Sequence, residues 1–65
     1  MKPTVQFTGK AEFLNAKNDD EEWEFARVYA LDHPRLGSQW VRTSEVVQKF
    51  EDGSFETRNT IYKPV

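Results

Sequence analysis

Residues 46–59 read Val46-Val47-Gln48-Lys49-Phe50-Glu51-Asp52-Gly53-Ser54-Phe55-Glu56-Thr57-Arg58-Asn59. Two runs that favour β structure flank a polar centre, which is the pattern of a β-hairpin. The pair Asp52-Gly53 readily takes the positive φ angles of a two-residue turn. A hairpin closed on that pair places Phe50 opposite Phe55 on one face and Lys49 opposite Glu56 on the other. We therefore expect this hairpin to set the fold.

The N-terminal part of the chain also shows a strand pattern. Every second residue is small or apolar over nine positions, namely Val5, Phe7, Gly9, Ala11 and Phe13. This spacing predicts one long strand bent at Gly9, or two short strands. From residue 14 to 22 the chain turns polar and contains four consecutive acids at 19–22, so we expect a solvated loop there.

The segment from Trp23 to Leu31 fits two structures. A helix over about 19–32 has suitable end signals, with Asn18 as N-cap, Glu21 at the capping-box position and Pro34 beyond the end. Its apolar residues, however, fall all round a helical wheel and leave no polar stripe. As a strand, one face carries Trp23, Phe25, Tyr29 and Leu31, interrupted by Arg27. The aromatic and β-branched content favours the strand, and the helix stays open as the α+β alternative.

The remaining segments also predict strands and connecting loops. Residues 32–38 contain Pro and Gly and predict an exposed loop, and residues 39–43 predict a strand with Trp40 and Arg42 on one face. A turn at Asn59-Thr60 and a last strand with Tyr62 follow. We expect residues 1–65 to form a single small, mainly β domain. Its form is a five- to six-stranded antiparallel barrel or curved sheet of the SH3-like kind.

Composition restricts the classes of function. The chain has nine basic and eleven acidic residues, a net charge of −2, and no cysteine. It therefore lacks the strong general attraction to phosphate of non-specific nucleic-acid binders, and it has no disulfide or thiolate metal site. It also lacks an apolar run of membrane-spanning length and an N-terminal signal sequence. We expect a cytoplasmic protein with no membrane partner.

Few residues are suited to catalysis or metal binding. His33 is the one histidine, and no nucleophile or further ligand shows a spacing that would converge on it. The acids at 19–22 lack the alternating positions and the glycine of a calcium loop. We interpret both as solvated loop residues. Accordingly we expect no enzyme activity, no cofactor and no metal.

Arginine and tryptophan give the most informative set, which consists of Arg35, Trp40, Arg42 and Arg58. Arginine beside an exposed ring can stack a base and bind a phosphate, and the same residue types are enriched at protein interfaces. The structural alternative is that Trp40 is buried and the arginines form ion pairs with Glu45, Glu51 or Glu56. Because a buried arginine without a partner is costly, we expect the face with Trp40 and Arg42 to be partly exposed.

The C-terminal block resembles the ending of many short proteins of bacteriophages and prophages. The resemblance covers about 25 residues through Thr-Ser-x-Val-Val at 43–47, Asp52-Gly53, and Glu-Thr-x-Asn-Thr-x-Tyr at 56–62. It implies a small accessory protein that acts in an infected bacterium, and many members of this class bind host proteins. It implies no activity and no site residue.

These observations lead to two functional hypotheses. The first is a non-enzymatic binding protein whose partner is a host or phage protein, or a second copy of the chain, since aromatic residues are abundant and β edges are exposed. The second is a nucleic-acid or nucleotide binder that uses Arg35, Trp40, Arg42 and Arg58. Salt-sensitive affinity and quenching of Trp fluorescence by an oligonucleotide would favour the second.

Overall fold

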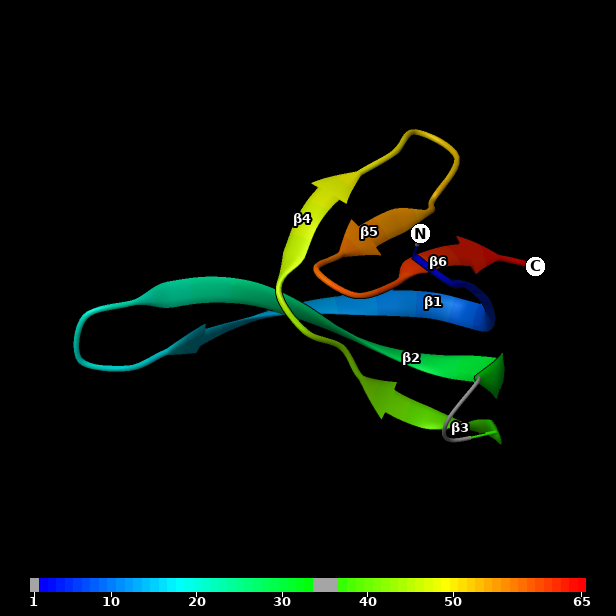
Figure 1. Ribbon diagram of the computed structural model, residues 1–65, viewed down its shortest axis with the longest axis horizontal. Helices are drawn as coiled ribbons and strands as arrows, with labels where there is room; N and C mark the ends of the chain where they lie inside the picture. The colour runs from blue at the N-terminus through cyan, green and yellow to red at the C-terminus, as the bar shows by residue number, and fades with distance from the viewer. Residues whose placement is uncertain (1, 34–36) are drawn as a thin grey trace.

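The chain folds into six strands joined by short turns. The computed structural model describes residues 2–33 and 37–65. The strands are β1 (Thr4–Lys17), β2 (Glu22–His33), β3 (Gly37–Arg42), β4 (Val46–Lys49), β5 (Phe55–Thr57) and β6 (Ile61–Pro64). They form one sheet in the order β3-β2-β1-β6-β5-β4 (Figure 1). The predicted mainly β fold is confirmed. Of the two expected forms, barrel or curved sheet, the structure has the curved sheet, which does not close.

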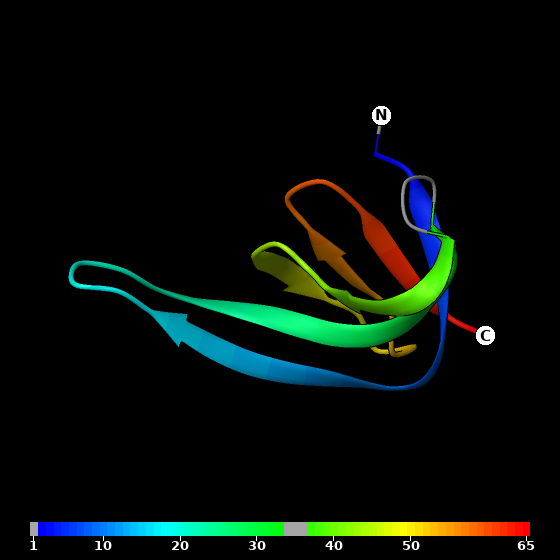
Figure 2. The same ribbon diagram turned by 90° about the horizontal axis from the view of Figure 1, so that it is seen from below.

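The sheet curls strongly, as the second view shows (Figure 2). The two ends of the sheet approach each other, since Lys49 of β4 pairs with Glu24 of β2 at 2.8 Å. The far end of the β1–β2 hairpin projects beyond the other strands (Figure 1). All pairings are antiparallel except that of β1 with β6, which is parallel and differs from the antiparallel expectation.

The concave side of the sheet holds the core. The buried apolar residues are Val5, Phe7, Ala26, Val28, Ala30, Val41, Phe55 and Tyr62. The Phe55 ring lies at their centre, 5.1 Å from the Tyr62 ring centroid, 5.2 Å from that of Phe13 and 5.7 Å from that of Phe7. The three large buried rings fill the concave side, which leaves room only for small residues from β2.

The segment Trp23 to Leu31 is a strand, as favoured, and no helix forms at 19–32. Strand β1 also runs further than predicted, to Lys17, because its alternate residues Leu14 and Ala16 lie opposite Phe25 and Trp23 across the hairpin. The predicted bend is present, with Gly9 at φ 78° beside a bulge between Thr8 and Glu12. The polar loop is therefore only residues 18–21, where the Asn18 side chain accepts hydrogen bonds from two following N–H groups.

The β4–β5 hairpin forms as predicted, but its register is shifted by one residue. Phe50 N–H donates to the Ser54 carbonyl at 2.9 Å, and Gly53 N–H donates to the Phe50 carbonyl at 3.2 Å. This is a three-residue loop that ends in a left-handed glycine, since Gly53 has φ 91° and Asp52 does not have a positive φ. The side chain of Asp52 instead accepts hydrogen bonds from the N–H and the hydroxyl of Ser54.

The shifted register changes which residues share a face. Lys49, not Phe50, lies opposite Phe55, and Gln48 lies opposite Glu56. Phe55 is fully buried whereas Phe50 is 41 % exposed, so the predicted Phe50–Phe55 pair is wrong. The predicted Lys49–Glu56 pair is wrong as well, because Glu56 pairs with Lys2 from the N-terminal end of the chain.

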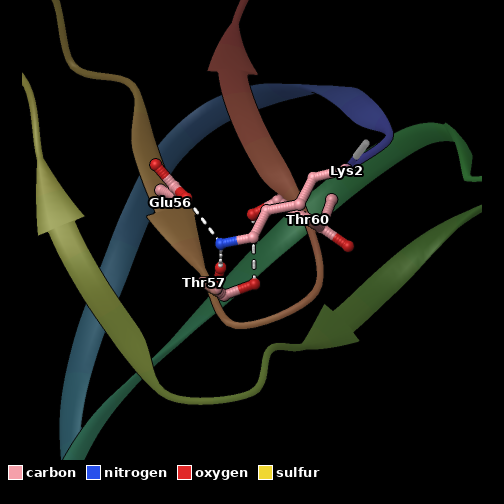
Figure 3. A network of polar contacts seen from close by, with 4 residues as sticks. All are labelled: Lys2, Glu56, Thr57 and Thr60. Carbon is pink, nitrogen blue, oxygen red and sulfur yellow. Dashed lines mark hydrogen bonds and ion pairs between the residues drawn. The ribbon is translucent and has the colours of Figure 1, made fainter.

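Polar contacts close the fold around this lysine (Figure 3). Lys2 Nζ donates to the Glu56 carboxylate and, at 2.9 Å, to the Thr57 carbonyl. The Thr57 hydroxyl in turn donates to the Thr60 carbonyl at 3.1 Å, across the turn between β5 and β6. Lys2 is thereby fixed to β5.

Candidate functional site: an aromatic and arginine face on β2 and β3

Strands β2 and β3 place their large side chains on the convex side of the sheet. We call this the outer face and define it as Phe25, Arg27, Tyr29 and Leu31 of β2 and Trp40 and Arg42 of β3, together with Leu14 of β1, which lies opposite Phe25. On β2 the buried side chains are instead Ala26, Val28 and Ala30, each 0 % exposed. The alternation predicted for β2 is thus confirmed, and its aromatic half faces outward.

Trp40 is the most exposed aromatic residue on this face, with 64 % of its surface accessible. It lies directly opposite Tyr29, and the two rings meet edge to face at 5.7 Å between centroids and 86° between planes. Val41 and Thr43 point to the core and are 7 % exposed. The predicted split of β3 into an exposed Trp40–Arg42 side and a buried side is therefore confirmed.

Two arginines lie opposite each other beside these rings. Arg27 and Arg42 are cross-strand neighbours on β2 and β3. Each has a separate contact, since Arg27 lies 4.0 Å from the Glu12 carboxylate and the Arg42 guanidinium lies 4.3 Å from the centroid of the Phe25 ring. Stacking on a ring leaves guanidinium N–H groups available to an acceptor. The outer face can thus offer aromatic surface and N–H donors to one partner.

The four predicted site residues do not all come together. Trp40 and Arg42 share the outer face, and Arg35 lies outside the described residues. Arg58 follows β5 and contacts Glu45 through Nε and a terminal nitrogen, each at 2.8 Å, which matches the ion-pair alternative for that residue. Phe25, Arg27 and Tyr29 take part instead. The signal for them was present in the alternation of β2, but their place beside Trp40 depends on the β2–β3 register.

Arg58 lines an open depression at the far end of the β1–β2 hairpin. Its volume is about 660 Å³, and its other lining residues are Asp20, Glu21, Glu22, Trp23 and Glu45. The acidic residues outnumber the single arginine in this lining, so the depression is more favourable for a basic group than for a phosphate.

The other candidate residues have no site geometry. His33 is the last residue of β2 and is half-buried, rather than lying in a loop. Within residues 2–33 and 37–65, no group of three or more acids or histidines is placed to hold a metal ion. The same ranges contain no helix of the length and apolar character needed to cross a membrane.

Comparison with protein-family models, with curated proteins and with solved structures finds no match to this chain.

Proposed function

We propose that this chain is a non-enzymatic binding protein whose outer face docks onto another protein. The observation that supports the proposal is the 64 % exposure of Trp40 within a row of partly buried rings and two arginines. Tryptophan, tyrosine and arginine are the residues most enriched among those that dominate binding energy at protein interfaces. Following the resemblance of the C-terminal block, we propose a phage-encoded accessory protein whose partner is a host or phage protein in the bacterial cytoplasm.

The outer face has the properties of the centre of an interface. Tyr29 and Phe25 are already held in place by Trp40 and Arg42, so a partner would bury them at little further cost in side-chain entropy. Covering the exposed part of a tryptophan of this size contributes on the order of 3 kcal/mol. The charge of the face is small, because Glu12 offsets one of its two arginines. Affinity would therefore come mainly from apolar contact.

The test begins with capture of partners from a lysate of the host bacterium, with a nuclease-treated lysate as control. A protein captured under both conditions is identified, purified and titrated against the chain. The Trp40→Ser variant is expected to lose the interaction. The matched control is Val47→Ser, because Val47 is 51 % exposed on β4, away from the outer face. Equal binding by the two variants would contradict the proposal.

A second candidate is binding of single-stranded nucleic acid. The specific observation in its favour is the pair Arg27–Arg42 next to the rings of Tyr29 and Trp40, since single-strand binders combine stacking rings with cations. Two phosphate contacts would give a slope of about −1.4 in the logarithm of affinity against the logarithm of salt concentration. Titration with a labelled oligonucleotide at several salt concentrations distinguishes this candidate from a protein partner.

A further inference from the structure

The outer edge of β3 is an open end of the sheet. In the strand order β3 comes first, and in the described part of the chain it pairs only with β2. An unpaired edge presents a row of N–H and C=O groups that can pair with another strand. The opposite end of the sheet is β4, which curls back toward β2 through the Lys49–Glu24 contact. The β3 edge is thus the better exposed of the two.

The pairing with β2 determines which backbone groups face outward. Thr43 N–H donates to the Ala26 carbonyl, and residues 39–42 continue the same antiparallel register. Because hydrogen-bonded and non-hydrogen-bonded pairs alternate in such a ladder, Gln39 and Val41 also direct their groups to β2. The N–H and C=O groups of Ser38, Trp40 and Arg42 therefore point to the open edge. The residue with the most exposed ring is also the middle one of these three.

The edge carries little protection against pairing. Proline, lysine and a local bulge are the usual devices that keep an edge strand from pairing with another chain. The strand Gly37–Arg42 contains no proline and no lysine. Its one charged side chain, that of Arg42, leans back over Phe25 of the neighbouring strand. The register shift between β2 and β3 lies between Gln39 and Gly37, so Gln39–Arg42 is the regular part of this edge and Ser38 borders the shift.

We propose that β3 pairs antiparallel with β3 of a second copy about a twofold axis at Trp40. In this register Trp40 lies opposite Trp40 of the second copy, and Arg42 lies opposite Ser38 of the second copy. All three residues with outward backbone groups then exchange hydrogen bonds across the axis. The sheets of the two copies become continuous, and their outer faces lie side by side. This self-association is independent of the proposed binding of a host or phage protein.

The side chains of β3 are the reason for proposing a second copy of the chain as the partner at this edge. An isologous interface needs a surface that is complementary to itself. Here the two arginines face serines, so like charges do not meet directly across the axis. The two Trp40 rings become cross-strand neighbours and extend the Tyr29–Trp40 row into a row of four rings. The net charge of −2 per copy adds little repulsion between the two chains.

The first test uses sedimentation equilibrium of the full chain over a range of concentrations. Arg42→Pro removes the outward N–H of Arg42 in each copy and no hydrogen bond to β2. It is expected to weaken the dimer by about 30-fold through the loss of two hydrogen bonds. Arg42→Ala is the matched control because it keeps the N–H, and it should dimerise at least ten times more tightly than the proline variant. A monomer at all concentrations, or equal effects of the two variants, would overturn the proposal.

A second test does not depend on the folding of the proline variant. In the wild-type chain, hydrogen exchange at the Trp40 and Arg42 amides should slow as protein concentration rises, whereas the Val41 amide, bonded to β2, should not depend on concentration. The Trp40→Lys variant places two lysines at the axis and should be monomeric, while Val47→Lys on β4 should dimerise like the wild type. Exchange at Trp40 that does not change with concentration would overturn the proposal, even if a host protein binds the outer face.

Discussion

At the scale of single residues, Phe55 carries more of the stability than any exposed ring. It contacts the rings of Phe7, Phe13 and Tyr62 and is fully buried. Phe55→Ala is expected to cost about 3–5 kcal/mol. Since a chain of 65 residues has a total stability of roughly 3–10 kcal/mol, much of the variant would be unfolded. Urea unfolding followed by circular dichroism measures the change.

The neighbouring Phe50 supplies the control for this prediction. It is 41 % exposed, so Phe50→Ala should change the free energy of unfolding by no more than about 0.5 kcal/mol. The comparison also tests the hairpin register, because the two-residue turn expected from Asp52-Gly53 would make the two phenylalanines equivalent partners. Similar losses for both variants would favour that turn over the three-residue loop.

The ionisation of Tyr62 should make the stability of the fold depend on pH in the alkaline range. Burial raises the pKa of its phenol above the usual tyrosine value of about 10, and a hydrogen bond with Thr60 partly opposes the rise. The folded state therefore prefers the protonated phenol. The stability associated with this preference is complete below pH 10, where the unfolded phenol is also neutral, and is lost as the pH rises through the folded pKa. The unfolding temperature of the wild type should fall above pH 10. In Tyr62→Phe this decrease should be smaller.

At the scale of elements, the hairpin turn shows how far local sequence determines structure. Asp52-Gly53 correctly indicates a turn between β4 and β5, but such a pair fits loops of two or of three residues. In the structure the three-residue loop is accompanied by hydrogen bonds from Ser54 to the Asp52 side chain. The shift of one residue places Phe50 at the surface instead of in the expected core. The presence of the hairpin was predictable, and its register was not.

Gly53 should be the residue on which this loop depends most. Its φ of 91° is strained for any residue with a Cβ, and the nearest neighbour of an added Cβ would be Pro64 Cγ at 3.5 Å, which is an ordinary contact. Gly53→Ala is therefore expected to cost roughly 1–2 kcal/mol through the backbone alone. Gly53→Asn should recover part of the loss, since asparagine tolerates this conformation better. Chemical denaturation of the three chains measures the order, and an alanine variant as stable as the wild type would contradict the loop geometry.

Strand β2 shows a similar limit for the candidate site. The alternation of residues 23–31 predicted one aromatic face and one small face, and both exist. Hydrophobicity alone would place the rings inside, yet Ala26, Val28 and Ala30 are buried. The reason is the curvature of the sheet, whose concave side is filled by rings from β1, β5 and β6. The site pair Trp40–Arg42 could be predicted from β3 alone, whereas the places of Arg27 and Arg58 depend on pairing and turns elsewhere in the chain.

At the scale of the whole molecule, the two ends of the chain hold the fold together. The parallel pairing of β1 with β6 joins residues 4–7 to residues 61–64. Ile61 N–H donates to the Pro3 carbonyl at 2.9 Å, and Val65 N–H donates to the Phe7 carbonyl at 3.0 Å. No local sequence pattern predicts a contact between segments that are so far apart in the sequence. The parallel pair is therefore not predictable from the sequence.

Substitution of Lys2 tests how far the contacts of the N-terminal residues stabilise the fold. Its ammonium group binds both the Glu56 carboxylate and the Thr57 carbonyl, and the two charged side chains are only 33 % and 26 % exposed. Hydrogen bonds of charged groups are worth more than neutral ones, so Lys2→Met is expected to cost about 1–3 kcal/mol in urea unfolding. Lys10→Met, at an exposed position of β1, should change stability by no more than about 0.5 kcal/mol. A double-mutant cycle with Glu56→Gln then separates the ion pair from the bond to Thr57. Equal stability of the two lysine variants would show that the N-terminal residues do not help to close the sheet.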